Sequence, residues 1–136
     1  MPHLTLDHSA NLSADGDFPG LCRKLAACLI AQRADARQVF PTGGVRVRAF
    51  AAKAWCIADG TLDAAYVHAA FKVGAGRSDA TLRAAGDALF EVMKVHFAVH
   101  FERMGLALSL EVGEFSEAGT WKHNNLHARL KPAGAG

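Results

Sequence analysis

The most constraining feature of this sequence is a long apolar stripe with helical spacing in its second half. Apolar residues recur every three or four positions over about six turns, at Leu82, Ala85, Leu89, Met93, Phe97, Phe101 and Met104. Such a stripe predicts one continuous amphipathic helix that lies against a core. Ser78 precedes it as the expected N-cap, and Gly105 follows it as the expected C-terminal stop. The rest of the chain must supply the apolar surface that this helix covers.

Short runs of alternating residues predict the strands that form this surface. The segments 3–8 and 45–53 alternate, and further strands are expected at 62–73 and 106–112. The dipeptide Asp59-Gly60 is a strong turn signal between two strand-like runs. The sequence therefore predicts four strands, of which the middle two are separated by a turn.

A second helix is predicted between the first two strands, over about 19–34, with Pro19 in its first turn. The polar continuation 33–38 fits either helix or loop. Cys22 and Cys28 fall in the apolar pattern of this helix and are expected to act as small core residues.

The order of these elements predicts an α+β fold made of two β-α-β units. Four strands and two long helices imply a four-stranded sheet with both helices on one face. A chain of 136 residues fits one domain, expected over 1–130, with 131–136 as a disordered tail. Apolar residues on both faces of the strands favour a cover from another subunit, and hence a homo-oligomer.

The charge pattern argues against several classes of partner. The net charge is +2, and the 15 lysines and arginines are scattered rather than clustered on one face, so we expect no nucleic-acid partner. No apolar run reaches the length of a membrane span, so no membrane association is expected. The N-terminus lacks the pattern of a signal peptide, and the three cysteines form no C-x-x-C pair. The expected location is therefore the cytoplasm.

Seven histidines raise a metal hypothesis, because His96 and His100 are spaced i, i+4, as are His123 and His127. A zinc site needs a third ligand and supporting contacts, and none is evident in the sequence. We therefore predict no metal and place His96 and His100 at the edge of the core. RNA-binding modules share the four-strand, two-helix plan, but this chain has one tyrosine and no aromatic-basic strand motif.

The first two residues, Met1-Pro2, suggest a different chemistry. An initiator methionine before a small residue is usually removed, which would leave the secondary amine of Pro2 at the terminus. An α-amino group has a pKa of about 7.7–8.0. Burial and nearby cations would lower the pKa of such an amine towards the range suited to a general base. The alternative is that Pro2 is a strand-edge residue, where its missing N–H costs nothing.

Seven short motifs extend over nearly the whole chain. Gly-Ala-Gly-Arg-Ser at 74–78 and Asn-Asn-x-His-Ala at 124–128 are the most specific. The others are Met1-Pro2-His3, Asp17-Phe18-Pro19-Gly20-Leu21, Phe40-Pro41 with Gly44-Val45-Arg46, Ala58-Asp59-Gly60 and Leu106-Ala107-Leu108-Ser109. In order and spacing the chain resembles the 5-carboxymethyl-2-hydroxymuconate isomerases, a family of the tautomerase superfamily. It departs from the family pattern around 31–38, which looks longer here, and in its glycine-rich tail.

The resemblance implies a trimer and cofactor-free isomerisation of a dienol polycarboxylate in aromatic catabolism. It implies that Pro2 is the general base and that Arg46 and Arg77 bind the substrate carboxylates, a task that suits the planar guanidinium. Without the resemblance, Arg46 is a charge on a solvated sheet face and Arg77 an exposed loop charge. Two alternatives stay open. One is a tautomerase for a different dienol acid, and the other is a non-catalytic binding or scaffold protein of the same fold.

Overall fold

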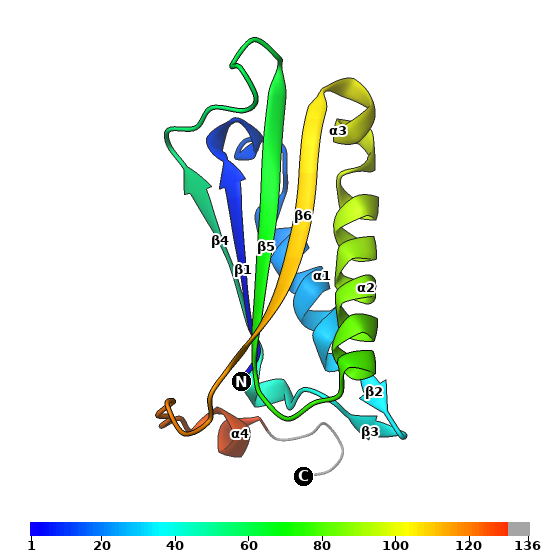
Figure 1. The fold of residues 1–136 in the computed structure, drawn as a ribbon, viewed down its shortest axis with the longest axis vertical. Helices are drawn as coiled ribbons and strands as arrows, with labels where there is room; N and C mark the ends of the chain where they lie inside the picture. The colour runs from blue at the N-terminus through cyan, green and yellow to red at the C-terminus, as the bar shows by residue number, and fades with distance from the viewer. Residues whose placement is uncertain (131–136) are drawn as a thin grey trace.

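The computed structural model describes residues 1–130 and contains one four-stranded sheet with helices on one side (Figure 1). The sheet has the order β4-β1-β5-β6, and its strands are β1 (His3–Ser9), β4 (Arg46–Ala52), β5 (Ala64–Gly74) and β6 (Gly105–Phe115). The long helices are α1 (Phe18–Ile30) and α2 (Asp79–His96). Both helices pack on the same face of the sheet. The predicted α+β architecture is confirmed, whereas the predicted tail at 131–136 lies outside the described residues.

The sheet consists of two parallel pairs joined in antiparallel at its centre. Strand β1 pairs in parallel with β4 across α1, and β5 pairs in parallel with β6 across α2. The central pairing of β1 with β5 is antiparallel. Because β1 lies between β4 and β5, the Asp59-Gly60 turn does not join neighbouring strands. It forms a local turn in which the Gly60 N–H donates to the Ile57 carbonyl, with φ of +83° at Gly60.

Helix α1 is shorter than predicted because the chain after it folds into a small hairpin. The Asp17 carboxylate caps its start by accepting the Gly20 N–H at 3.1 Å. The helix ends at Ile30, and β2 (Arg33–Ala34) then pairs with β3 (Arg37–Gln38). The two turn residues between these strands have positive φ values of 51° and 63°, which a continuing helix cannot contain. The polar segment 33–38 is thus neither the continued helix nor the irregular loop that the sequence allowed.

The second long helix is interrupted, which corrects the prediction of one continuous helix to Gly105. Helix α2 ends at His96, and the short α3 (Ala98–Arg103) follows. The intervening Phe97 has φ −102° and ψ 16°, outside the helical range, and its side chain is fully buried. Beyond this break the predicted stripe is only partly kept, since Phe101 is 64% exposed whereas Met104 still packs against the core. Gly105 is the first residue of β6 rather than a cap.

The core lies between the sheet and its two helices. Its largest fully buried side chains are Phe40, Phe71, Phe97, Leu4, Leu6, Leu12, Leu21, Leu25, Leu29, Leu89, Met93 and Val67. Cys22 and Cys28 are only partly buried and pack against the margin of this core, as small apolar residues do. Burial of this set is the main force that holds the helices on the sheet.

The opposite face of the sheet is more polar than the sequence pattern suggested. Tyr66 donates its hydroxyl hydrogen to Asp7 at 2.7 Å, and the His68 Nε2 lies 3.1 Å from the Glu111 carboxylate. Phe50 is 57% exposed on this face, and Phe115 lines a hollow there. The apolar residues expected on the second face are therefore present, but polar and charged side chains lie among them. A partner that covers this face would meet mainly hydrogen-bonding groups.

Two of the four histidines of the metal hypothesis hold a neighbouring loop. His96 Nε2 lies 2.7 Å from the Gly16 carbonyl oxygen, and His100 Nε2 lies 3.3 Å from the Asp15 carboxylate. Within residues 1–130, no group of three or more histidine, cysteine or acidic side chains is placed to hold a metal ion. In the same range, no helix combines the length and apolar character needed to cross a membrane.

Candidate active site

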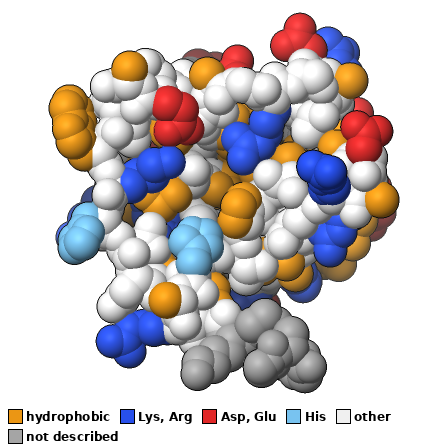
Figure 2. Space-filling model, turned by 90° about the horizontal axis from the view of Figure 1, so that it is seen from below, with side chains coloured by type: hydrophobic (Ala, Val, Ile, Leu, Met, Phe, Trp, Pro, Cys, Tyr) orange, Lys and Arg blue, Asp and Glu red, His pale blue; other side chains and the backbone are white. Residues whose placement is uncertain are grey.

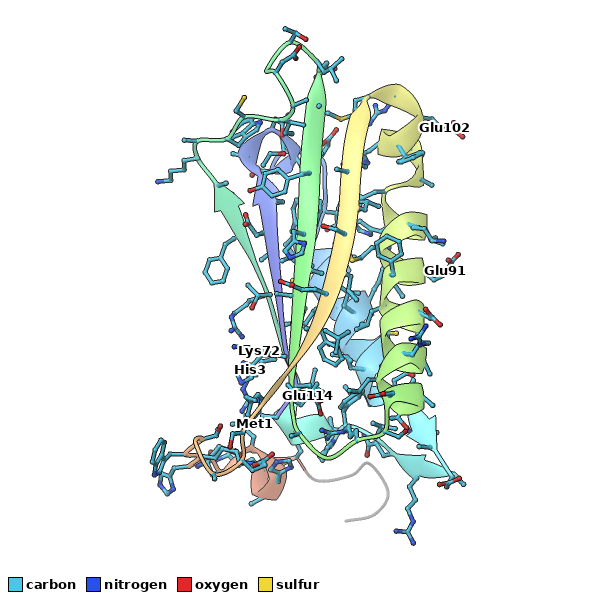
Figure 3. All side chains as sticks on the ribbon, viewed as in Figure 1. Met1, His3, Lys72, Glu91, Glu102 and Glu114 are labelled. Carbon is cyan, nitrogen blue, oxygen red and sulfur yellow. The ribbon has the colours of Figure 1, made fainter. Side chains whose placement is uncertain are left out.

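The chain terminus lies at the end of the sheet where β4 begins and β5 ends. The register pairs His3 with the first residue of β4, and the Arg46 N–H donates to the Pro2 carbonyl at 3.0 Å. Pro2 is buried, and Met1 is half-buried beside it. Figure 3 shows Met1, His3 and Lys72 gathered at this end, while Glu91 and Glu102 point away from the helices. The first strand thus carries the terminus into a sheltered position.

A turn of 3₁₀ helix, η2 (Thr42–Gly44), packs directly on this terminus. A Cβ added at Gly44 would lie 3.5 Å from both the Met1 Cα and the Pro2 Cδ. The backbone of the turn therefore approaches the terminal residues to van der Waals distance. This contact contributes to the burial of Pro2, which precedes β1 on the same side as the buried Leu4 and Leu6.

Arg46 is held beside the terminus by backbone carbonyls. One guanidinium nitrogen donates to the Gly43 carbonyl at 2.8 Å and to the Val45 carbonyl at 3.2 Å. The other lies 3.6 Å from the Met1 sulfur. Because a guanidinium has five N–H donors, these contacts fix its position and leave donors for an anion.

Arg77 reaches the same end of the molecule from the loop after β5. Its guanidinium donates to the Gly74 and Val39 carbonyls, each at 3.2 Å. The guanidinium carbon also lies 4.9 Å from the centroid of the buried Phe40 ring. Such a cation–π contact is worth about 0.5–2 kcal/mol. Arg77 is therefore an anchored group rather than a mobile loop charge.

These cations surround the terminal amine and change its acidity. Burial lowers the pKa of the Met1 amine below its ordinary value of 8.0, and the positive charges of Lys122, Arg77 and Arg46 lower it further. The Glu117 carboxylate acts in the opposite direction. An amine in this setting carries more of its free-base form at neutral pH than an ordinary α-amino group.

The segment after β6 completes the site, and the sequence had given no role to residues 116–130. It passes beneath the sheet and ends in α4 (Leu126–Arg129), which packs on η2. Lys122, His123, Asn124 and His127 line a cavity of about 380 Å³ together with Met1. The only sequence signal for this role was the Asn-Asn-x-His-Ala motif.

Met1 also borders a second hollow on the open sheet face. This hollow measures about 340 Å³ and is lined by His3, Arg48 and Lys72, among others. Figure 2 looks onto this end of the molecule and shows basic and histidine side chains distributed over it. A larger hollow of about 690 Å³ lies between α2 and β6, but its lining includes neither the terminal residue nor Arg46, Arg77 or Lys122. We therefore place the candidate site at the terminus rather than in the larger hollow.

A four-stranded sheet of paired β-α-β units, with a terminal amine among cations, defines a protein of the tautomerase class. The chain belongs to the 5-carboxymethyl-2-hydroxymuconate isomerase family, whose model matches residues 2–130. Membership of this family confirms both the predicted resemblance and the expectation of an isomerase.

Individual relatives agree with this membership. The 5-carboxymethyl-2-hydroxymuconate Delta-isomerase of Escherichia coli is 40% identical over 131 residues, which cover 96% of this chain and 100% of that protein. The crystal structure of a 5-carboxymethyl-2-hydroxymuconate isomerase from Deinococcus radiodurans R1 is 46% identical, with a TM-score of 0.87 over 96% of this chain and 94% of that chain. A native fused 4-OT, 17% identical with a TM-score of 0.64 over 94% of this chain and 98% of that chain, shares the fold alone.

Proposed function

We propose that this protein converts 5-carboxymethyl-2-hydroxymuconate, a dienol with three carboxylates, to its unsaturated keto form without a cofactor. The proposal takes its substrate from the relative in Escherichia coli, which is similar over its whole length. The observation that carries the chemistry is the chain terminus at the sheet end, where burial and the charges of Lys122, Arg77 and Arg46 act on the Met1 amine. Once Met1 is removed, the Pro2 amine would be the terminal amine beside the same cations. This combination suits a base that works on a polyanion at neutral pH.

In the proposed mechanism, removal of Met1 exposes the secondary amine of Pro2 as the general base. The amine takes the proton of the 2-hydroxyl group, and the electrons move through the diene to C5. The same proton then returns to C5, so that one O–H bond is broken and one C–H bond is formed. The carbonyl at C2 stays conjugated to the remaining double bond, and the step requires no oxidant or metal.

Arg46 and Arg77 have two roles in this mechanism. They bind substrate carboxylates through charge-assisted hydrogen bonds, which are stronger than neutral ones. They also stabilise the negative charge that develops on the dienolate. Because the same cations lower the pKa of the amine, substrate binding and activation of the base depend on one set of charges.

A homotrimer is the assembly that we propose. The edge strand β6 is 11 residues long, and its outer edge pairs with no other strand among residues 1–130. Long unpaired edges are normally covered, and another subunit would provide that cover. Trp121 is 88% exposed and Leu62 is 65% exposed, which an isolated subunit does not need. A solved structure with the same fold is described as an asymmetric trimer of fused 4-OT.

The cytoplasm is the location that we propose for this enzyme. Its three cysteines are all free thiols, as is usual for proteins of a reducing compartment.

The test is a turnover assay on protein whose N-terminus has been determined by mass spectrometry. Protein that begins at Pro2 should convert the dienol, which is measured as a loss of its ultraviolet absorbance. This activity should persist after the protein has been dialysed against a chelator. A panel of other dienol acids would reveal a different substrate. Protein that begins at Pro2 but converts none of these acids would contradict the proposal and favour a binding or scaffold role.

A further inference from the structure

The proposed substrate carries three carboxylates, whereas the two arginines discussed above provide two guanidinium groups. The dienol chain has a carboxylate at each end, and the carboxymethyl branch adds a third. A site that discriminates this branch needs another donor beyond those that bind the chain ends. Such a donor should come from a segment other than the turn that holds Arg46 and the loop that holds Arg77.

Lys122 meets this requirement by position. It belongs to the segment after β6, and it lines the same cavity as Met1. Its Nζ lies 3.2 Å from the Glu117 carboxylate. Glu117 in turn lies against Gly74, where an added Cβ would collide with its carboxylate. The Lys122–Glu117 pair therefore spans from the loop that carries Arg77 to the chain terminus.

The contacts of Lys122 differ from those of the arginines. Arg46 and Arg77 are tethered by backbone carbonyls, whereas Lys122 forms an ion pair with Glu117 in which the two side chains are 38% and 53% exposed. An exposed pair of this kind contributes little to stability and exchanges readily. An incoming carboxylate can replace Glu117 at modest cost. Lysine also suits an adaptable contact, because its ammonium is a point charge on a flexible stem.

We propose that Lys122 binds the carboxylate of the carboxymethyl branch and thereby selects the tricarboxylate over an unbranched 2-hydroxymuconate. This inference rests on the proposed function and assigns one part of the same site. The electrostatics agree with it, since Lys122 is the charge with the largest lowering effect on the pKa of the terminal amine, ahead of Arg77. Lys122 and Met1 line one cavity, so a substrate held at the terminus would lie beside this ammonium.

The test compares two substrates across three variants. The substrates are 5-carboxymethyl-2-hydroxymuconate and 2-hydroxymuconate, and kcat/KM is measured on the high-pH plateau of each profile so that the base is unprotonated throughout. K122M should lower kcat/KM for the branched substrate by about tenfold to a hundredfold. The same variant should change kcat/KM for the unbranched substrate by less than about threefold, because that substrate lacks the third carboxylate. K122R should restore most of the preference. K94M is the matched control, since Lys94 forms a surface pair with Glu91 on α2.

The outcomes separate this inference from the proposed function. An equal loss of kcat/KM on both substrates in K122M would show that Lys122 does not bind the carboxylate of the branch. No loss of kcat/KM on either substrate would show that Lys122 forms a surface ion pair only. Either result overturns the inference while the wild type still turns over. Absence of turnover by the wild type on both substrates would instead contradict the proposed function, and the role of Lys122 would fall with it.

Discussion

The guanidinium carbon of Arg77 lies 4.9 Å from the centroid of the Phe40 ring, which is itself fully buried. Phe40 packs edge-on against Phe71 at 5.5 Å between ring centroids. A charge of the candidate site is thus positioned directly by the hydrophobic core. The core and the site are coupled at this point.

This coupling predicts that Phe40→Leu impairs the site beyond its effect on stability. The free energy of unfolding should fall by about 1–2 kcal/mol, because the smaller side chain leaves a partial void. KM for the substrate should also rise several-fold as Arg77 loses its aromatic support. Phe97→Leu is the control, since Phe97 is equally buried but packs near His96 and His100. Equal kinetics for the two variants would contradict the coupling.

Pro2→Ala should lower kcat far more than it changes KM. Alanine leaves a primary amine in the same place, so a weaker base and a residual rate are expected. The measurement is steady-state kinetics on protein whose first residue is verified by mass spectrometry. An unchanged turnover number would exclude Pro2 as the base.

Arg46→Ala and Arg77→Ala should each reduce kcat/KM by tenfold to a hundredfold. Each variant loses a charge-assisted contact worth about 1.5–3 kcal/mol. Arg103→Ala is a suitable control, because Arg103 is an exposed arginine on α3 that pairs with Asp15. Wild-type kinetics in both site variants would show that these arginines are not part of the site.

The same two variants should also shift the pH–rate profile. Activity needs the free amine, so it declines as the pH falls through the pKa of that amine. Positive neighbours lower the pKa of the terminal amine in the chain that begins at Met1. The same neighbours should lower the pKa of the Pro2 amine, and removal of one should raise it. The acidic limb should therefore move to higher pH in both variants. High salt should move it in the same direction in the wild type, because counterions screen the cations.

Gly43→Ala should impair activity through the segment that closes the cavity. A Cβ at Gly43 would lie only 2.7 Å from the His127 ring, so this ring, which lines the cavity, must shift. The loss of stability should be small, because residues 121–130 are all exposed. Gly119→Ala serves as the control in the same segment, since its Cβ would make ordinary contacts at 3.8 Å. If the two alanine variants turn over equally, the segment does not shape the site.

The protein should have about three times the mass of its 14.4 kDa chain in solution. Light scattering at micromolar concentration measures this directly, and a monomer would refute the trimer. Phe50→Asp should weaken the assembly if the open sheet face takes part in it, because a charge would replace an exposed aromatic ring. Thermal unfolding of the variant provides a check that the subunit itself remains folded.

The order of strands and helices can be predicted from local sequence patterns. Alternation and helical spacing are local properties, and they located all four long strands and both long helices. The motif around Arg46 and the one that ends in Ser78 also directed attention to both arginines. Local pattern was less informative where tertiary contacts prevailed. The break at Phe97 and the hairpin at 33–38 both depend on how the chain turns against the core.

The set of distant residues that share the candidate site depends on how the folded chain packs. The register of β1 with β4 brings Pro2 beside Arg46, and the loop after β5 adds Arg77. The segment after β6 then adds Lys122 to the cavity at the terminus. No periodicity in the sequence predicts that these residues come together, because their proximity depends on strand pairing and on the packing of a terminal segment at the end of the sheet. Sequence fixes the properties of each element, whereas long-range packing determines which charges reach the amine.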